Sequence, residues 1–502
     1  MARDLILSLD QGTTSTRAVI YDLNLVQIAE SSQPLEQQYP APAWVEHDPV
    51  EIYEAARTVI ADVLKQVAPD IPRAMGITNQ RETVIAWSKS TGVPVHNALV
   101  WQDRRTATFC NELRESGFEP VVANRTGLLL DPYFSASKIR WLLDNVPDAR
   151  DQAEKGELLV GTVDTWLIWK LTGGRVHATD ATNASRTQLY NIHTGHWDGV
   201  LLALFGVSAQ ILPVVRATQE NFGITDKTVT GAEIPIAGVV GDQQSAAYGQ
   251  ACFSGGDIKA TFGTGCFVLV NTNTQPVLSQ NRLLTTILNR IEGRKLYALE
   301  GSVFMAGATI QWLLDNLGII ESAKETEALA READPDSGVH LVPAFQGLGA
   351  PQWDSDARGL ICGLSRKAGR AEIVRAALEG VAWQTYDLMS AIAADMTAAG
   401  IDPPTRLRVD GGMARNDWFL QFLADILNIP VDRSGHLEAT ALGAACHAGL
   451  RVGLIENENA LSAFWQADKT FTPKMHDKER QRRLNGWQEA VSRTTSSKDH
   501  LS

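Results

Sequence analysis

The sequence predicts an α/β protein made of two similar halves, each built around a glycine-threonine loop between strands. The first loop, Asp10-Gln11-Gly12-Thr13-Thr14, follows an apolar run at 5–9, and the second, Gly263-Thr264-Gly265, precedes an apolar run at 266–270. Glycine lets the backbone turn tightly, and threonine hydroxyls add donors beside the backbone N–H groups. Two such loops suggest two related domains that hold a polyphosphate between them.

Composition fits a globular protein with two domains. The 502 residues are enough for two separate cores, and 44% hydrophobic with 21% charged residues is ordinary for this class. The net charge of −13 argues against a general electrostatic attraction to nucleic acid or to an anionic membrane. A phosphate would have to be held by local amides and a few placed cations.

The chain shows no sign of export or membrane insertion. No apolar run approaches the roughly 18 residues of a membrane span, and the stretch before Asp10 is too short for a signal peptide. The five cysteines are scattered and never form a C-x-x-C pair, which argues against a disulfide framework and against a zinc site. We therefore expect a cytoplasmic protein with reduced thiols.

The first half of the chain is expected to begin with a hairpin of strands at 5–9 and 17–22. A helix should run from Asp48 to about Val67, because aspartate is a good N-cap and Pro49 suits the first turn. Further elements are expected as strands at 73–78 and 82–87 and as helices at 106–116, 135–144 and 163–171.

The second half repeats the pattern. A buried strand over 234–242 should deliver Asp242 to its end, with a helix from Gln243 to Gly249. The strand-loop-strand pattern returns near 257, and another strand at 407–412 ends in glycines. We place the domain boundary near 250, giving domains at 1–250 and 251–502, with a surface helix after about 475 and a polar tail after about 494.

The first loop carries more polar groups than a turn requires. The chain lacks both the Walker A loop and the G-x-G-x-x-G fingerprint, so phosphate would be bound by another architecture. A polar hairpin turn is the simpler explanation of residues 10–17. However, four consecutive hydroxyl residues with Asp10 before them and Arg17 after them favour phosphate and Mg²⁺, which takes oxygen ligands including one or two carboxylates.

Gln80-Arg81-Glu82 is a second candidate site. Adjacent opposite charges usually lie on the surface, but these follow an apolar strand, and α/β sheets bind ligands at strand ends. We expect the connecting segment Asn79-Gln80-Arg81 to be exposed there. A guanidinium donor beside a carboxylate acceptor suits neighbouring hydroxyls, as in a polyol.

Asp242 is the candidate base, since it lies between a buried strand and a helix. The alternative is a helix N-cap. Segments around Trp101 and Tyr133 could form an aromatic wall or simply pack in the core. Two further segments, 306–312 and 411–416, could be ordinary helix packing and an ordinary strand-to-helix turn. His193 and His196 lie among turn residues and are interpreted as surface residues, not metal ligands.

Together these segments closely resemble the carbohydrate kinase family of the actin, hexokinase and heat-shock ATPase superfamily, and within it the members that phosphorylate glycerol. The resemblance runs from about Leu5 to Leu450 and implies two ribonuclease H-like (actin-like ATPase) domains with a nucleotide cleft between them. It rests on LDQGTTSTRA (9–18), WVEHDP (44–49), ITNQRET (77–83), VWQDRR (100–105), DPYFS (131–135), residues 161–187, GDQQSAAYGQ (241–250), TFGTGCF (261–267), YALEGSVFMAGATIQWL (297–313), GLGAPQWD (347–354), VDGG (409–412) and TALGAA (440–445). The pairing of NQRE with DPYF and GTGCF points to glycerol over pentuloses.

The resemblance implies a role for each matching residue. Asp242 would act as general base on a terminal hydroxyl of glycerol, with ATP as phosphoryl donor, ADP as product and Asp10 acting on Mg²⁺ through water. The glycerol oxygens would be held by Arg81, Glu82, Tyr133, Asp242 and Gln243, and the carbon chain by Trp101 and Phe267. Nucleotide contacts would come from Thr13, Thr14, Ser15, Arg17, Thr264, Gly307, Gln311, Gly412 and Asn416.

Departures from the family pattern concern regulation. Some bacterial members bind fructose 1,6-bisphosphate through Gly-x-Arg, whereas this chain has Gly231-Ala232-Glu233, so we expect that inhibition to be weak or lost. Residues 473–481 depart from the segment that binds a sugar-transport phosphocarrier, so that regulation is not expected either. Gln352 replaces the tyrosine of the family motif GAPYWD, and nothing in the sequence explains this change. The family implies a homodimer or homotetramer.

Two other functions compete with a glycerol-phosphorylating enzyme. A kinase of the same family could act on another polyol or sugar, such as erythritol or xylulose. A non-catalytic ATP-binding interaction protein would predict a disrupted acceptor site or a missing base, whereas Arg81, Glu82 and Asp242 are all present.

Overall fold

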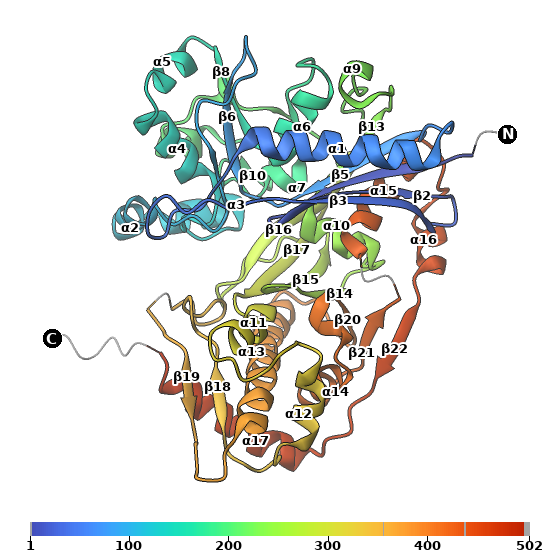
Figure 1. Ribbon diagram of the computed structural model, residues 1–502. Helices are drawn as coiled ribbons and strands as arrows, with labels where there is room; N and C mark the ends of the chain where they lie inside the picture. Colours follow the sequence, from blue (N-terminus) through green and yellow to red (C-terminus); the bar gives the residue numbers. More distant parts are fainter. Residues whose placement is uncertain (1–2, 355, 436–437, 496–502) are drawn as a thin grey trace.

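Two α/β lobes, one above the other, make up the protein in a computed structural model that describes residues 3–354, 356–435 and 438–495 (Figure 1). The first lobe is built on a five-stranded sheet in the order β13-β5-β1-β2-β3. Strands β1, β2 and β3 are antiparallel neighbours, while β5 is parallel to β1 and β13 is parallel to β5. Their bounds are β1 Ile6–Gln11, β2 Ser15–Tyr21, β3 Gln27–Pro34, β5 Ala74–Asn79 and β13 Ile236–Gly241.

The second lobe repeats this order. Its seven-stranded sheet runs β16-β17-β15-β14-β20-β21-β22, so that β17-β15-β14-β20-β21 has the directions and order of β3-β2-β1-β5-β13. In both lobes the glycine-threonine loop is the turn of the first hairpin. The predicted fold of two actin-like halves is therefore confirmed. The strands are β14 Ile258–Phe262, β15 Cys266–Asn273, β16 Leu284–Ile291, β17 Arg294–Val303, β20 Leu407–Asp410, β21 Val431–Ser434 and β22 Ala467–Phe471.

Helices cover these sheets and join the lobes. α1 (Pro49–Val67) packs on β2 and β3, and Asp48 caps it by accepting a hydrogen bond from Val50 N at 2.7 Å, as predicted. α13 (Arg370–Ala398) packs against β17 in the second lobe. Between the two sheets, α10 (Asp242–Gly249) packs against α15 (Ala439–Arg451), and α15 also packs on β1, β5 and β13 of the first lobe (Figure 1). α15 thus contacts the first lobe, although the later strand β22 and helix α17 (Asp477–Ser492) lie in the second.

The remaining elements decorate these two cores. A four-stranded sheet beside the first one contains β4 Glu46–His47, β6 Val84–Ser88, β7 Ala98–Leu99 and β8 Leu158–Thr162, and two-stranded sheets contain β9 Ala178–Asp180 with β12 Val214–Arg216, β10 Tyr190–Asn191 with β11 His196–Trp197, and β18 His340–Val342 with β19 Leu360–Cys362. The helices are α2 Ala107–Glu115, α3 Glu119–Thr126, α4 Ser135–Asn145, α5 Ala149–Glu154, α6 Val163–Leu171, α7 Ala181–Ala184, α8 Gly199–Phe205, α9 Lys227–Thr230, α11 Gly307–Asp315, α12 Glu325–Glu332, α14 Asp417–Leu427 and α16 Glu458–Phe464.

One expectation about exposure is wrong. Asn79, Gln80 and Arg81 are buried rather than exposed at the strand end. The reason is that other segments cover them: Asn79 Nδ2 donates to Asn183 Oδ1 at 3.0 Å, and Arg81 pairs with Glu300 from the second lobe. The end of β5 is therefore an interior position between the lobes.

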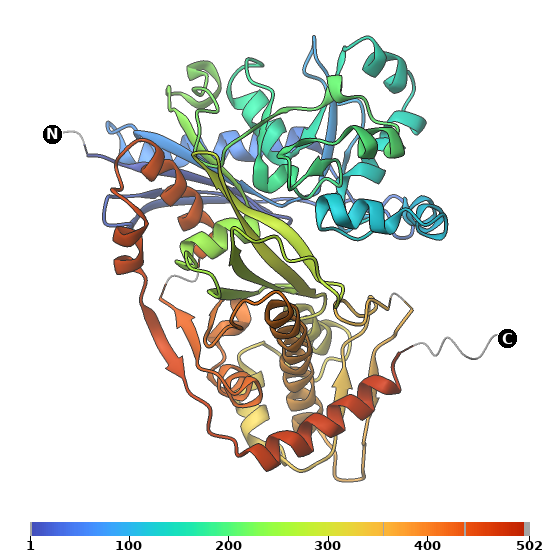
Figure 2. The ribbon, with the colours of Figure 1, turned by 180° about the vertical axis from the view of Figure 1, so that it is seen from behind.

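The predicted surface helix near the end of the chain and the surface position of two histidines are found in the structure. α17 (Asp477–Ser492) lies along the foot of the second lobe (Figure 2), where it buries Leu484, Trp487 and Ala490. The predicted tail after about 494 falls largely on residues 496–502, outside the described residues. His193 and His196 are exposed. Throughout the described part of the chain all five cysteines are free, and no helix is long and apolar enough to cross a membrane.

The close contact between α10 and α15 predicts that one methyl group added at this interface lowers the stability of the fold. A Cβ at Gly443 would lie 1.9 Å from the carbonyl oxygen of Ser245, a backbone atom that cannot move aside alone. We expect Gly443→Ala to lower the free energy of unfolding by about 3 kcal/mol, the upper range for overpacking. Urea denaturation would measure this loss against Gly199→Ala, at a position with no atom within 4 Å. Equal stability of the two variants would contradict the argument.

Candidate active site

Asp242 lies where β13 ends and α10 begins, at the level between the two lobes. It is the first helical residue, while Gly241 is the N-cap, so the N-cap alternative is not realised. Its Oδ1 lies 3.1 Å from Arg81 Nε and accepts a hydrogen bond from Gln243 N at 2.7 Å. The Asp242 side chain keeps 29% of its surface exposed. The carboxylate is therefore fixed on one side and accessible on the other, as a proton acceptor must be.

Arg81 reaches Asp242 from a buried network of charges. Its two terminal nitrogens donate to the two carboxylate oxygens of Glu300 on β17, at 2.5 and 2.9 Å. Arg186 lies 3.0 Å from the same carboxylate and donates to Glu82 at 2.5 Å. Arg81 and Glu82 thus pair with these partners instead of forming one adjacent donor–acceptor couple.

The charge of Glu300 is strongly stabilised. Burial alone would raise the pKa of this carboxyl group, but Arg186 and Arg81 outweigh burial and lower the pKa to about 2. By contrast, burial raises the pKa of Glu82 despite Arg186 beside it. Glu82 also has a left-handed backbone with φ of 62°, which is uncommon for a side chain other than glycine and is found at functional sites.

Three aromatic rings from three distant segments form a wall beside this network. The ring centroid of Trp101 lies 5.6 Å from that of Tyr133 and 6.2 Å from that of Phe267, both in edge-to-face geometry. The indole nitrogen of Trp101 donates to Thr13 Oγ1 at 3.0 Å, which connects the wall to the first loop. A buried lysine, Lys138, donates to the carbonyls of Pro132, Tyr133 and Phe134 and so holds the Tyr133 segment.

The first loop is a closed turn with hydroxyl groups at the surface. Gly12 N donates to Ser15 O at 2.9 Å, and Thr13, Thr14 and Ser15 all retain exposure. Arg17 lies 2.5 Å from Glu438 and 3.3 Å from Glu30. The loop therefore carries partly exposed hydroxyl groups with the Arg17 guanidinium beside them.

Asp10 is the acidic group at the base of this loop. Burial raises its pKa to about 7, and the charge of Asp242 adds to that effect while Arg17 opposes it. A carboxylate whose charge is disfavoured in this way is suited to a nearby cation. No group of three or more His, Cys, Asp or Glu side chains that could hold a metal occurs among the described residues, so a cation would also need ligand oxygens from phosphate.

The second loop lies against the start of α11. Gly307 N donates to Gly263 O at 2.9 Å, and Ala306 N and Ala308 N both donate to Thr264 O at 3.0 Å. A Cβ at Gly307 would lie 2.5 Å from Gly263 O, so only glycine permits this approach. Gly411 approaches the same strand, since its Cβ would lie 2.5 Å from Phe262 O, and its φ of 88° also requires glycine.

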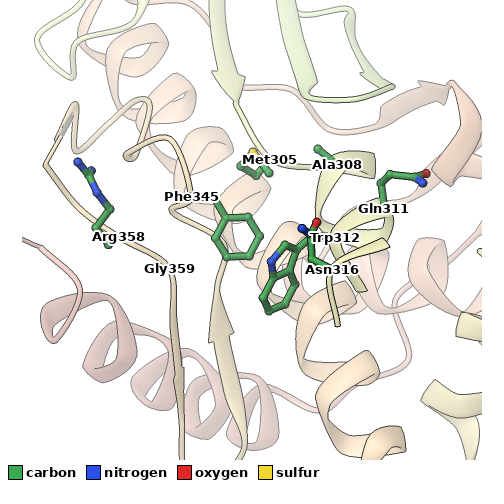
Figure 3. Close-up of a pocket in the computed structure, with 8 residues that line it drawn as sticks. All are labelled: Met305, Ala308, Gln311, Trp312, Asn316, Phe345, Arg358 and Gly359. Atoms are coloured by element: carbon green, nitrogen blue, oxygen red, sulfur yellow. The ribbon is translucent and has the colours of Figure 1, made fainter. Parts of the chain in front are cut away.

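A pocket of about 470 Å³ opens along one side of α11 (Figure 3). Gln311 lies at one end of it, and Trp312 with Phe345 forms its apolar floor, the two ring centroids 4.6 Å apart. The other predicted nucleotide residues do not line this pocket. Asn416 caps α14 by accepting from Phe419 N at 2.9 Å, and its amide nitrogen donates to Thr326 Oγ1 at 3.1 Å.

Comparison with known proteins assigns the family. Residues 5–249 match the N-terminal domain of the FGGY family of carbohydrate kinases, and residues 258–451 match its C-terminal domain. The chain belongs to the FGGY family of carbohydrate kinases. It is 52% identical to a glycerol kinase of Brucella ovis, covering 97% of this chain and 98% of that protein. It is 53% identical to a glycerol kinase of Rhodospirillum centenum, covering 98% and 99%.

A solved FGGY-type structure is similar over nearly the whole chain. The crystal structure of Plasmodium falciparum glycerol kinase with ADP has a TM-score of 0.92 and 39% sequence identity, covering 99% of each chain. A gluconate kinase from Lactobacillus acidophilus, at 23% identity and a TM-score of 0.87, shares the fold.

In this FGGY kinase, sequence reasoning missed four buried charged residues at the site. Glu300 follows the apolar run at 296–299, and Lys259 lies between Ile258 and Ala260. Each position is a usable signal, because a buried charge needs a partner. Arg186 and Lys138 are also fully buried, but their neighbours in the sequence include polar residues, so nothing marks them as buried charges. None of the four could have been paired with its partner from sequence spacing alone.

The buried network predicts a large effect of removing one charge. Glu300→Gln would leave Arg81 and Arg186 with too little negative charge, and we expect the free energy of unfolding to fall by about 3–5 kcal/mol. Because the pKa of Glu300 is about 2 instead of 4.5, its stabilising effect is complete above pH 4.5 and is lost as the pH falls toward 2. Urea unfolding of both proteins between pH 7 and pH 3 would measure it.

The control for this prediction is Glu332→Gln, at an exposed position on α12. We expect its stability to remain within about 0.5 kcal/mol of the wild type at every pH. A Glu300→Gln variant as stable as this control at pH 7 would mean that the buried network does not stabilise the fold.

Proposed function

We propose that this protein transfers the terminal phosphoryl group of ATP to glycerol, giving glycerol 3-phosphate and ADP. The observation that carries the proposal is a carboxylate, Asp242, held by Arg81 at the edge of a site walled by Trp101, Tyr133 and Phe267. The glycerol kinases that align over nearly the full length support the choice of acceptor.

Asp242 is the proposed general base. Its partly exposed carboxylate would accept the proton of a terminal glycerol hydroxyl as that oxygen forms a bond to the phosphorus and the bond to the departing ADP breaks. Arg81 orients the carboxylate through its Nε, and Glu300 in turn fixes Arg81. In phosphoryl transfer the protein acts mainly by positioning and by neutralising charge.

The acceptor site combines polar and apolar contacts. Arg81, Glu82, Tyr133 and Gln243 would hydrogen-bond the glycerol oxygens, while Trp101 and Phe267 would contact the carbon chain. Because the Trp101 ring packs edge-to-face on both Tyr133 and Phe267, the wall favours a three-carbon acceptor over a pentulose.

The nucleotide would lie between the two loops. Thr13, Thr14, Ser15 and Arg17 would contact phosphates from the first lobe, and Thr264 from the second. Gly307, Gln311, Gly412 and Asn416 would line the remainder. Asp10 fits a Mg²⁺ site shared with phosphate oxygens, since its partly buried carboxylate lies close enough to Asp242 to sense its charge. When bound, the ion would neutralise phosphate charge.

We also infer a cytoplasmic enzyme and a homodimer or homotetramer. The free cysteines of the described chain support a reducing environment. The oligomeric state rests on the family resemblance.

The direct test is ADP release from Mg-ATP with glycerol, erythritol, xylulose and no acceptor measured side by side. We expect turnover with glycerol, and a 10²–10⁴-fold lower kcat in Asp242→Asn, the usual contribution of a general base. Turnover with a larger polyol alone would overturn the choice of acceptor. Acceptor-independent hydrolysis, or none, would favour a nucleotide-binding interaction protein.

Regulation provides a second prediction. Glu233 is exposed two residues after Gly231, which ends α9 in a left-handed conformation. Its negative charge should repel a sugar bisphosphate, so we expect little inhibition of glycerol turnover by fructose 1,6-bisphosphate. Glu233→Arg, assayed in parallel, should be the more sensitive protein. Strong inhibition of the wild type would contradict this expectation.

A further inference from the structure

Lys259 is a buried cation that the proposed reaction does not use. It lies on β14, just before the second loop, and has 0% exposed surface. Its ammonium group donates to the side-chain oxygen of Gln243, to Thr261 Oγ1 at 3.0 Å and to the Phe267 carbonyl at 3.4 Å. Three acceptors satisfy the three protons of the ammonium group. Two of them belong to residues that would contact the acceptor.

The contact with Gln243 fixes the orientation of its amide. An ammonium group can only donate, so Gln243 must turn its oxygen to Lys259 and its nitrogen to the other side. Among the described residues, that amide nitrogen has no hydrogen-bond partner, and it keeps contact with solvent although the residue as a whole is only 7% exposed. The nitrogen is therefore a free donor that a bound molecule can reach, on the residue next to Asp242.

The surrounding charges explain why a lysine can stay here. Burial lowers the pKa of Lys259, while Asp410, Asp242 and Glu300 oppose that shift and Arg81 adds to it. Lys259 also joins β14 of the second lobe to α10, which begins with the proposed base. It therefore links the second sheet directly to the helix that carries Asp242.

We propose that Lys259 is a positioning residue of the acceptor site, which orients the Gln243 amide so that its nitrogen donates to an oxygen of the bound acceptor. This inference rests on the proposed function, because the acceptor is the molecule whose oxygen would satisfy the donor. The amide nitrogen would recognise a hydroxyl or carbonyl oxygen of the bound molecule, because either oxygen can accept its hydrogen bond.

A double-mutant cycle tests the inference with Lys259→Met, Gln243→Ala and the double variant. Loss of one hydrogen bond to the acceptor should raise the glycerol KM about tenfold in either single variant, with the ATP KM within about twofold of the wild type. If Lys259 acts through Gln243, the double variant should resemble Gln243→Ala. Additive effects, or an equal rise of both KM values, would overturn the inference. Lys259→Arg keeps the donors and should recover most of the affinity.

Two further measurements separate the possible failures. Thermal unfolding of each variant identifies any variant that is misfolded. If Lys259→Met is misfolded, Lys259→Arg replaces it in the cycle, and we expect a smaller effect on the glycerol KM that is still not additive with Gln243→Ala. Calorimetric titration of each variant with glycerol, without nucleotide, gives dissociation constants for the same double-mutant cycle independently of turnover. Wild type that binds glycerol but does not phosphorylate it would refute the function and leave the inference testable by binding; no binding would overturn both.

Discussion

The pair formed by Arg81 and Glu300 is the interaction on which the rest of the site depends. It joins the end of β5 in the first lobe to the middle of β17 in the second, with both side chains almost fully buried. Burying two charges is expensive unless the geometry is good and other partners share them. Here the contact has two parallel hydrogen bonds, and Arg186 and Asp242 supply the remaining partners. The orientation of Asp242 is thus a consequence of how the lobes meet.

The duplicated sheet order explains why two separate loops converge. In each lobe the glycine-threonine turn lies at the same end of the first hairpin, and α10 and α15 fill the space between the sheets through glycine contacts. Since Gly443 and Gly249 place helix backbone directly against backbone, the separation of the sheets is set by atoms without side-chain flexibility. The loops are therefore brought together by the packing of the helices between them.

Much of the fold could be predicted from the sequence, because its elements carry local signals. Asp48 with Pro49 marks the start of α1, and apolar runs beside glycines mark β1, β14 and β20. The exposure of Arg81 was predicted wrongly, since the cover over it comes from Glu300, far away in the chain. Likewise the partners of Glu82 and Gln243 could not be predicted, because hydrogen bonding between distant strands leaves no spacing in the sequence. The resemblance supplied the residue types, but not the contacts that orient them.

A common principle links the two buried lysines of the site. Neither Lys138 nor Lys259 forms a direct ion pair with a carboxylate among the described residues; each donates to neutral oxygens of segments that carry proposed acceptor contacts, Tyr133 in one case and Gln243 with Phe267 in the other. A lysine paired with a carboxylate would neutralise charge, whereas one that donates to carbonyl and amide oxygens fixes the direction of a dipole. The direction of these dipoles matters for a small polyol, because its hydroxyl groups are chemically alike. A site can distinguish them only by placing a hydrogen-bond donor against one hydroxyl and a hydrogen-bond acceptor against another. The arginines and carboxylates of the network hold Asp242, and the two lysines fix the segments that carry Tyr133, Gln243 and Phe267.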